Sequence, residues 1–348
     1  MDYLNKILVG DVREKLLELP AESVHCCVTS PPYWGLRDYG VDGQLGLEAT
    51  PQEYVEKMVG VFREVRRVLR SDGTLWLNIG DSYAGSGRGM NGDGTAGKCG
   101  EKQTTNAGAV LDMHDRRVQA GAIGRDWIAP PPGLKCKDLV GIPWRLAFAL
   151  QADGWWIRSD IIWAKPNPMP ESVTDRPTKA HEYLFLLARS ERYYYDMMAI
   201  REDAEYTPDR PTTGWDMTSG TDHKQKRGRY RNPAPKGSFN GKTSIEAPRE
   251  EAFRAVVLKR NKRSVWTIAT QPYEEAHFAT FPEAIVEPCI LAGSPADGVV
   301  LDPFMGSGTT ALVALKAGRK FVGVELNPKY AAMAERRIAP ELNQLRLV

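Results

Sequence analysis

The chain has 348 residues, of which 42% are hydrophobic and 26% are charged, and its formal net charge is +2. This composition is that of a soluble globular protein with one elaborated domain or two. No apolar run approaches the roughly 18 residues of a membrane-spanning helix, and the N-terminus lacks the features of a secretory signal. The five cysteines show no metal-ligand spacing, so we predict no metal site and expect a reduced, cytoplasmic protein with no membrane contact.

The N-terminal part begins with a short apolar strand, predicted at residues 6–9, that ends at Gly10-Asp11. A helical pattern follows at residues 12–19, and Asp11 stands where an N-cap would stand. A second apolar strand is predicted at residues 24–28. It contains the adjacent Cys26 and Cys27, which we interpret as packing residues.

The second strand runs into the hexapeptide Thr29-Ser30-Pro31-Pro32-Tyr33-Trp34. Each proline removes a backbone donor and fixes φ, so the turn is stiff and the Pro31 carbonyl has no helix or ladder partner. With the Ser30 hydroxyl and the Tyr33 ring, this carbonyl forms an acceptor corner for a planar group that carries an amino function. The alternative is a strand that ends in a proline turn beside a core tyrosine.

The middle of the chain alternates helix and strand patterns. Apolar residues recur at helical spacing over residues 51–69, and a strand is predicted at 74–79. The glycine-rich segment 82–133 predicts a long mobile loop, because such loops are usually disordered or functional. A helix over 144–151 begins after Pro143, and strands are predicted at 155–163 and 182–188. Residues 192–195 could extend the sheet; we interpret their aromatic side chains as core packing, with stacking on bases as the alternative.

The segment 200–263 has few aliphatic residues and an unusual charge. Residues 221–263 contain thirteen Lys or Arg and four Asp or Glu, whereas the rest of the chain is net acidic. A basic block on an acidic body indicates a polyanionic partner. The alternative is a solvated basic loop without a partner. Under the first interpretation the candidate contacts are Lys226, Arg227, Arg229, Lys262 and Arg263.

The C-terminal part carries a second motif, after a predicted helix at 283–291. An apolar strand at 299–301 runs into Asp302-Pro303-Phe304-Met305-Gly306-Ser307-Gly308-Thr309-Thr310, followed by a helix to residue 317. Glycines at a strand-to-helix turn let a ligand approach the backbone and the helix N-terminus. The next strand, residues 321–324, ends at Glu325, nineteen residues after Gly306. An acidic residue there can bind ribose hydroxyls, so the pattern indicates a nucleoside-type cofactor.

Together the two motifs resemble those of amino-group DNA methyltransferases, in the class whose catalytic motif precedes the cofactor motif. The family's (Asp/Asn/Ser)-Pro-Pro-(Tyr/Phe) tetrapeptide is Ser30-Pro31-Pro32-Tyr33 here. The stretch from Asp302 to Thr310 resembles the family's S-adenosylmethionine loop. Residues 321–325, with Asn327-Pro328 after them, resemble its ribose-binding strand. The resemblance covers most of the chain outside 82–135 and 200–263.

The resemblance and the alternating patterns predict a doubly wound, Rossmann-like α/β fold with a mostly parallel seven-stranded sheet whose last strand is antiparallel. Residues 1–199 then form the catalytic part, 200–263 an inserted target-recognition region, and 264–348 the cofactor-binding part. The implied catalytic residues are Ser30, Pro31, Pro32 and Tyr33. The implied cofactor-binding residues are Asp11, Asp302, Phe304, Gly306, Ser307, Gly308, Thr309, Thr310, Glu325 and Asn327, with the N-cap as the alternative role of Asp11.

The implied reaction moves a methyl group from S-adenosylmethionine to the exocyclic amino group of a base flipped out of double-stranded DNA. Ser30 Oγ and the Pro31 carbonyl accept the amine protons while Tyr33 stacks on the base, so neither a cysteine nucleophile nor a metal is needed. In the family, serine before the two prolines tends to mark the 4-amino group of cytosine. Asp or Asn tends to mark the 6-amino group of adenine, which we keep as the alternative.

Other functions also remain open from the sequence. The glycine turn is compatible with a dinucleotide oxidoreductase, although the Ser-Pro-Pro-Tyr corner and the basic block then have no role. A non-catalytic DNA-binding module and an RNA substrate are two further alternatives. A homodimer and a cognate restriction endonuclease are partners that the resemblance leaves open.

Overall fold

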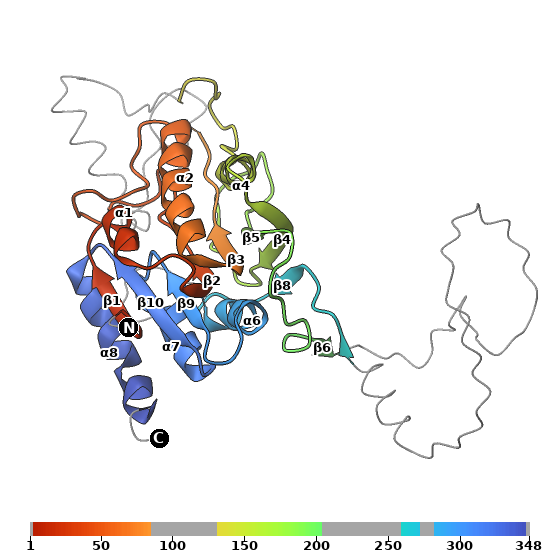
Figure 1. The fold of residues 1–348 in the computed structure, drawn as a ribbon. Helices are drawn as coiled ribbons and strands as arrows, with labels where there is room; N and C mark the ends of the chain where they lie inside the picture. Colours follow the sequence, from red (N-terminus) through yellow and green to blue (C-terminus); the bar gives the residue numbers. More distant parts are fainter. Residues whose placement is uncertain (1–2, 85–130, 204–258, 272–281, 346–348) are drawn as a thin grey trace, which may run out of the picture. The chain divides into compact units, whose positions relative to one another are not determined.

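The computed structural model describes residues 3–84, 131–203, 259–271 and 282–345 (Figure 1). The chain divides into two compact units, one formed by residues 1–200 with 263–348 and the other by 201–262. In the described part of the second unit, β6 (Glu202–Asp203) pairs antiparallel with β7 (Lys259–Arg260). All other elements below belong to the first unit.

The first unit is built on an eight-stranded sheet with the order β1-β10-β9-β2-β3-β5-β4-β8. Its strands are β1 (Lys6–Val9), β2 (Val24–Thr29), β3 (Leu69–Ile79), β4 (Trp156–Ala164), β5 (His181–Ala188), β8 (Val265–Thr267), β9 (Val299–Asp302) and β10 (Lys320–Glu325). The strands β1, β10, β9, β2 and β3 pair parallel in that sequence. Their carboxyl ends therefore meet at one edge of the sheet, where open α/β sheets bind ligands.

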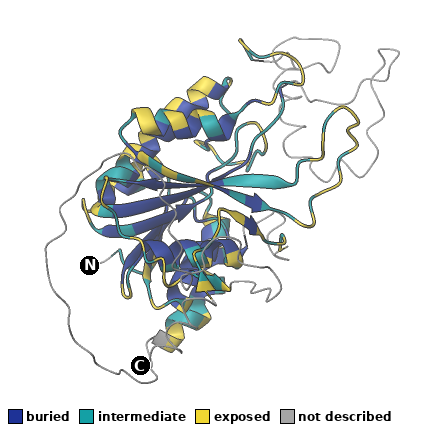
Figure 2. Ribbon diagram, turned by 90° about the vertical axis from the view of Figure 1, so that its right-hand side faces the viewer, coloured by how far each residue is buried: buried dark blue, intermediate teal, exposed yellow. Residues whose placement is uncertain are grey.

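Helices cover both faces of this sheet (Figure 1). They are α1 (Val12–Lys15), the 3₁₀ turn η1 (Leu16–Glu18), α2 (Pro51–Val68), α4 (Ile142–Ala152), α6 (Glu283–Gly293), α7 (Thr309–Lys316) and α8 (Pro328–Leu345). The first four pack with one core cluster, and α6, α7 and α8 pack with the other. The central strands β2, β3, β9 and β10 are largely buried on both faces, whereas β4 exposes alternate residues and the helices expose their outer sides (Figure 2).

Neighbouring residues of a strand contribute to opposite cores, because side chains alternate across a sheet. Cys27 lies in the cluster with α2, and Cys26 lies in the cluster with α6 and α7. Both cysteines are fully buried. Burial raises the pKa of the Cys26 thiol to about 12, so this thiol is not a nucleophile at neutral pH.

The predicted doubly wound α/β fold is confirmed, with one additional strand. All seven predicted strands are present, and the strand at 182–188 is antiparallel as predicted, since β5 pairs antiparallel with both β3 and β4. The eighth, β8, adds three residues at the edge beside β4. A three-residue edge strand has too little periodicity to stand out in a sequence.

One local prediction was wrong, and one possible extension of the sheet is absent. The strand β3 starts at Leu69, directly after α2, where a helix end and a turn were expected. Residues 192–195 lie outside the sheet: Tyr195 stacks on Trp76, with ring centroids 6.3 Å apart. Its aromatic surface covers the sheet instead of extending it.

Among the described residues, no helix has the length and apolar character needed to cross a membrane.

Candidate active site

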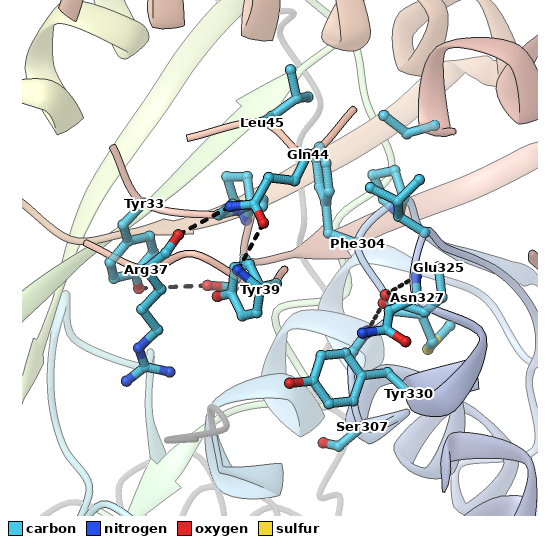
Figure 3. A pocket seen from close by; sticks show the side chains of 18 of the residues that line it. Tyr33, Arg37, Tyr39, Gln44, Leu45, Phe304, Ser307, Glu325, Asn327 and Tyr330 are labelled. Carbon is cyan, nitrogen blue, oxygen red and sulfur yellow. Dashed lines mark hydrogen bonds between the residues drawn. The ribbon is translucent and has the colours of Figure 1, made fainter. Parts of the chain in front are cut away.

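One pocket lies at the carboxyl edge of the parallel strands. The turns after β1, β2 and β9 supply Asp11, Ser30 and Phe304 to its lining, and the ends of β10 and β3 supply Glu325 and Asn78. Residues more than 300 positions apart in sequence, such as Asp11 and Glu325, thus line one cavity. In Figure 3, Tyr33 lies toward one end of this pocket and Glu325 and Asn327 lie toward the other.

Most of the predicted site residues line this pocket. All four predicted catalytic residues do so. Seven of the ten predicted cofactor residues also do: Asp11, Phe304, Gly306, Ser307, Thr309, Glu325 and Asn327. The other three, Asp302, Gly308 and Thr310, are not part of the lining.

Asp302 and Thr310 are fully buried and support the cofactor loop instead of facing the pocket. The Asp302 carboxylate accepts hydrogen bonds from Thr29 Oγ1 at 2.7 Å, from Thr310 Oγ1 at 2.7 Å and from the Phe304 amide at 3.0 Å. It thereby ties the end of β2 to the turn after β9 and to α7. Burial raises the pKa of Asp302 to about 6, against these three hydrogen bonds. The predicted contact of Asp302 and Thr310 with the cofactor stays a prediction, and in the structure both side chains hold the loop that lines the pocket.

The two glycines of the turn have different tasks. Both have positive φ, 52° at Gly306 and 80° at Gly308, where only glycine is unstrained. A Cβ on Gly308 would lie 2.9 Å from the Cβ of Ala334 in α8, so Gly308 allows the turn to pack on that helix. A Cβ on Gly306 would meet only its own loop, at 4.0 Å. Gly306 is thus the glycine that leaves its side of the turn open to a ligand.

Glu325 lies beside the Gly306 turn, at the same end of the pocket. Its Oε2 accepts from the Gly306 amide at 2.7 Å, and its Oε1 accepts from the Asn327 amide at 2.9 Å. Burial raises the pKa of this carboxyl, and the backbone donors oppose that shift. Each carboxylate oxygen can accept a second hydrogen bond, so a diol finds two acceptors here.

Asp11 lies both at the N-cap of α1 and in the lining of the pocket. It accepts from the Arg13 amide at 2.8 Å and so caps α1, and it also lines the pocket. The Arg13 guanidinium donates to the same carboxylate and lowers its pKa. The N-cap role is therefore present, and it does not remove Asp11 from the pocket.

The Ser-Pro-Pro-Tyr corner is oriented by Asn78 at the end of β3. Ser30 Oγ donates to Asn78 Oδ1 at 3.2 Å, and the Tyr33 hydroxyl lies 3.0 Å from the same oxygen. The Asn78 amide is oriented in turn, because its Nδ2 donates to the Tyr183 carbonyl of β5 at 3.2 Å. A serine hydroxyl that donates to Asn78 keeps its lone pairs for another partner. Ser30 is therefore an acceptor toward the pocket.

The Tyr33 ring is placed by Gly80 and Glu182. A Cβ on Gly80 would lie 2.5 Å from the ring, so the backbone after β3 packs directly on the aromatic face. The Tyr33 hydroxyl donates to Glu182 Oε2 at 2.7 Å. Burial and the nearby Glu182 charge hold the Tyr33 pKa well above its usual range, so the phenol stays protonated.

Asn78 and Glu182 line the pocket beside the corner and were not predicted from the sequence, whereas the proline-rich segment that begins at Lys165 is one that the resemblance places beside the catalytic pocket, and Lys165 does line it. Lys165 follows β4, forms an ion pair with Glu182 Oε1, and places its ammonium 4.2 Å from the centroid of the Trp163 ring. A signal for Glu182 was available. An antiparallel strand brings its first residues to the edge where its parallel neighbours end, and Glu182 is the second residue of β5.

A loop over residues 35–46 forms another wall of the pocket (Figure 3). Its ends are joined by the hydrogen bond from the Gly35 amide to the Gly46 carbonyl, at 2.8 Å. Gln44 Oε1 accepts from the Tyr39 amide at 2.7 Å. The Tyr39 ring meets Tyr330 of α8 edge-on, with centroids 6.4 Å apart. The loop thereby contacts the helix that follows the Glu325 strand.

Only two of the five residues predicted to contact DNA lie among the described residues. Lys226, Arg227 and Arg229 lie outside the described residues, as does most of the predicted loop 82–133. Lys262 belongs to the second unit and Arg263 to the first. In the part of the chain that the structure describes, no group of three or more His, Cys, Asp or Glu is arranged to hold a metal ion.

Comparisons with known proteins identify the family of the chain. A family model described as DNA methylase matches residues 24–336. The Type II methyltransferase M.SmaI of Serratia marcescens is 44% identical over 333 residues, which is 96% of this chain and 90% of that protein. Two solved structures are similar in fold. The PvuII DNA methyltransferase, which is cytosine-N4-specific, has a TM-score of 0.55 at 17% identity and 97% and 91% coverage. A putative DNA modification methylase of Thermus thermophilus, complexed with S-adenosyl-L-methionine, has a TM-score of 0.51 at 23% identity and 97% and 96% coverage.

Proposed function

Since this chain belongs to the DNA methylase family, we propose that it moves a methyl group from S-adenosylmethionine to the 4-amino group of a cytosine flipped out of duplex DNA. The family and the enzyme class predicted from the two motifs are confirmed by these matches. The oxidoreductase alternative is thereby set aside. The target base and the role of each residue are the proposal.

The two ends of the pocket suit the two reactants. At one end, Glu325 offers acceptors for a ribose diol, and the open turn at Gly306 suits the amino-acid part of the donor. At the other end, Ser30 and Tyr33 suit the base. Because both ends belong to one pocket, the target nitrogen and the donor methyl can meet without crossing solvent.

The reaction needs help at the amine. The nitrogen is conjugated with its ring and is a poor nucleophile, whereas the bound donor supplies an already activated methyl group. Ser30 Oγ, oriented by Asn78, can accept an amine proton and direct the nitrogen lone pair toward the methyl. Tyr33 can stack on the base from the wall at Gly80. The catalytic contribution is thus positioning and fixed dipoles.

The observation that carries cytosine over adenine is the neutral, short acceptor at Ser30. Its polar support is an amide oxygen of Asn78 at 3.2 Å, so no charge lies directly on the accepting hydroxyl. The family tends to place serine before the two prolines for cytosine N4 and Asp or Asn for adenine N6. Adenine N6 is the second candidate, since its amine has the same chemistry.

The test is to identify the methylated nucleoside. Unmethylated DNA is incubated with the protein and S-adenosylmethionine, digested to nucleosides and analysed by mass spectrometry. We expect N4-methylcytosine. N6-methyladenine would instead support the second candidate, adenine N6. The absence of any methylated nucleoside, with saturating donor and varied DNA, would refute methyl transfer.

A pair of serine variants tests the role of the corner. Ser30→Ala should lower turnover about a hundredfold or more, in line with the loss of one preorganised hydrogen-bonding group, and should leave donor affinity near normal. Ser23→Ala is the matched control, because Ser23 Oγ donates to the Pro20 carbonyl before the other end of β2. Equal turnover in the two variants contradicts the assignment of Ser30.

Contacts to DNA outside the pocket are also a proposal. The charge of the basic block suits phosphate contacts by Lys226, Arg227, Arg229, Lys262 and Arg263. Two arginines of α2 fit this role less well, since Arg63 and Arg67 form ion pairs with Asp153 and Glu64. The homodimer, the cognate restriction endonuclease and the cytoplasmic location stay predictions.

A further inference from the structure

The polar groups of the corner form a chain that ends at a carboxylate. Ser30 Oγ lies 3.4 Å from the Tyr33 hydroxyl, which donates to Glu182 Oε2 at 2.7 Å. Lys165 is paired with the other oxygen, Oε1, so Oε2 is the oxygen that faces Tyr33. The chain runs from the place of the target amine to a negative charge on β5.

We propose that Glu182 is the final acceptor of the proton that the target amine loses, and that Ser30 and Tyr33 conduct it there. This inference rests on the proposed methyl transfer and adds a step to it. An amine that gains a methyl group must lose a proton to become a neutral product. The Ser30 and Tyr33 hydroxyls can pass a proton on, and an ionised carboxylate can keep it.

Atoms, electrons and charge balance in this step. The nitrogen lone pair forms the new N–C bond, and the electron pair of the broken C–S bond stays on the donor sulfur. The N–H proton moves to Ser30 Oγ, the Ser30 proton moves to the Tyr33 oxygen, and the Tyr33 proton moves to Glu182 Oε2. Both hydroxyls end neutral, the base ends neutral, and Glu182 ends as a carboxylic acid beside the Lys165 ammonium.

The other carboxylates of the pocket are less suited to this step. Within the described lining the acids are Asp11, Glu182 and Glu325. Asp11 is occupied by the Arg13 guanidinium, and Glu325 accepts two backbone amides beside the cofactor turn. Glu182 alone among these three is hydrogen-bonded to the Ser-Pro-Pro-Tyr corner.

The contact of 3.4 Å between Ser30 and Tyr33 is long for a hydroxyl pair. Such contacts are often long in ligand-free sites and tighten when the substrate binds. Ser30 donates to Asn78 Oδ1 before the reaction, which orients it as an acceptor. A rotation of its hydroxyl toward Tyr33 then opens the path to Glu182.

The experiment measures single-turnover methylation with saturating donor, so that product release does not mask the chemical step. The variants are Glu182→Gln, which keeps an oxygen for Tyr33 but cannot hold the proton, Tyr33→Phe, which keeps the ring but breaks the path, and the double variant. Glu171→Gln is the matched control. Glu171 is also ion-paired, to Arg176, and it does not line the pocket.

We expect Glu182→Gln to slow the single-turnover rate by about a hundredfold or more, the usual size of a proton-transfer contribution. The double variant should be no slower than the slower single variant, because both changes break one path. Donor and DNA affinities and the control variant should match the wild type.

The pH profile separates proton acceptance from a structural role. Any loss of single-turnover rate on acidification that depends on this acceptor should be present in the wild type and absent from Glu182→Gln. The charged or titratable groups that act on Glu182 are Lys165, Lys179 and Tyr33, and all three are unchanged in that variant.

Three results overturn the inference. They are a wild-type rate in Glu182→Gln, multiplicative losses in the double variant, and a loss in Glu182→Gln that comes with collapsed donor or DNA binding. A wild-type protein that methylates no DNA refutes the proposed function instead. The two failures are thus distinguishable.

Discussion

Replacement of Asp302 by Asn tests whether a buried charge supports the cofactor loop at a cost to stability. The carboxyl is fully buried, and its pKa is raised from the ordinary 3.8 to about 6. Asn has the same shape and does not ionise. It can keep an oxygen for Thr29 and the Phe304 amide, while Thr310, whose hydroxyl also lies 3.3 Å from the Val28 carbonyl, accepts from the new amide nitrogen.

The expected change in the free energy of unfolding follows from the shift in the pKa of Asp302. A folded-state pKa above the unfolded value means that protonated Asp302 favours folding, fully at pH below the unfolded value near 4. That contribution is lost as the pH rises through about 6. A shift of roughly two units corresponds to about 3 kcal/mol. The Asp302→Asn variant should therefore be more stable than the wild type by about 3 kcal/mol at pH 8, and by less than about 1 kcal/mol at pH 4.

The assay is urea denaturation of both proteins at pH 4 and pH 8. Asp160→Asn is the matched control, because Asp160 is an exposed residue of β4. We expect the control to show no comparable gain at pH 8. If Asp302→Asn is destabilised equally at both pH values, the three hydrogen bonds of the carboxylate outweigh the cost of its burial, and the reasoning is refuted.

Three further predictions concern the ligand sites. Glu325→Ala should weaken S-adenosylmethionine binding by about one to two decades, because a charge-assisted hydrogen bond is worth about 1.5–3 kcal/mol. Glu325→Gln should weaken binding less. Equal calorimetric affinities for the wild type and Glu325→Ala would remove this carboxylate from the cofactor site. Gly80→Ala should lower turnover and spare donor affinity, because its Cβ would lie 2.5 Å from the Tyr33 ring; an unchanged turnover number would show that the ring is free to shift. The third change neutralises Lys226, Arg227 and Arg229 together. The slope of log DNA affinity against log salt concentration should become shallower by about 2–3. An unchanged slope would favour the solvated-loop interpretation of the basic block.

The sequence alone determined the elements and the two motifs. Strand and helix periodicity is local, so seven strands and the main helices could be predicted, with errors mainly at their ends. The Ser30–Tyr33 corner and the turn at Gly306 could be found because prolines and glycines restrict the backbone through their own covalent structure. Glu325 could be found because its distance from Gly306 is set by one helix and one strand.

The tertiary structure alone decided which polar groups meet. The place of Glu182 at the start of an antiparallel strand indicates the edge of the sheet at which it lies, but not its partners. Asn78 and Glu182 reach the corner through the pairing of β3 with β5, in which Asn78 lies opposite Leu184. Asp302 shows the converse, since its motif predicted contact with a ligand, whereas the packing of β2 against β9 directs it to Thr29. Hydrogen-bond partners distant in sequence depend on strand order and register. No local pattern of residues encodes them, because they arise only when the whole sheet is assembled.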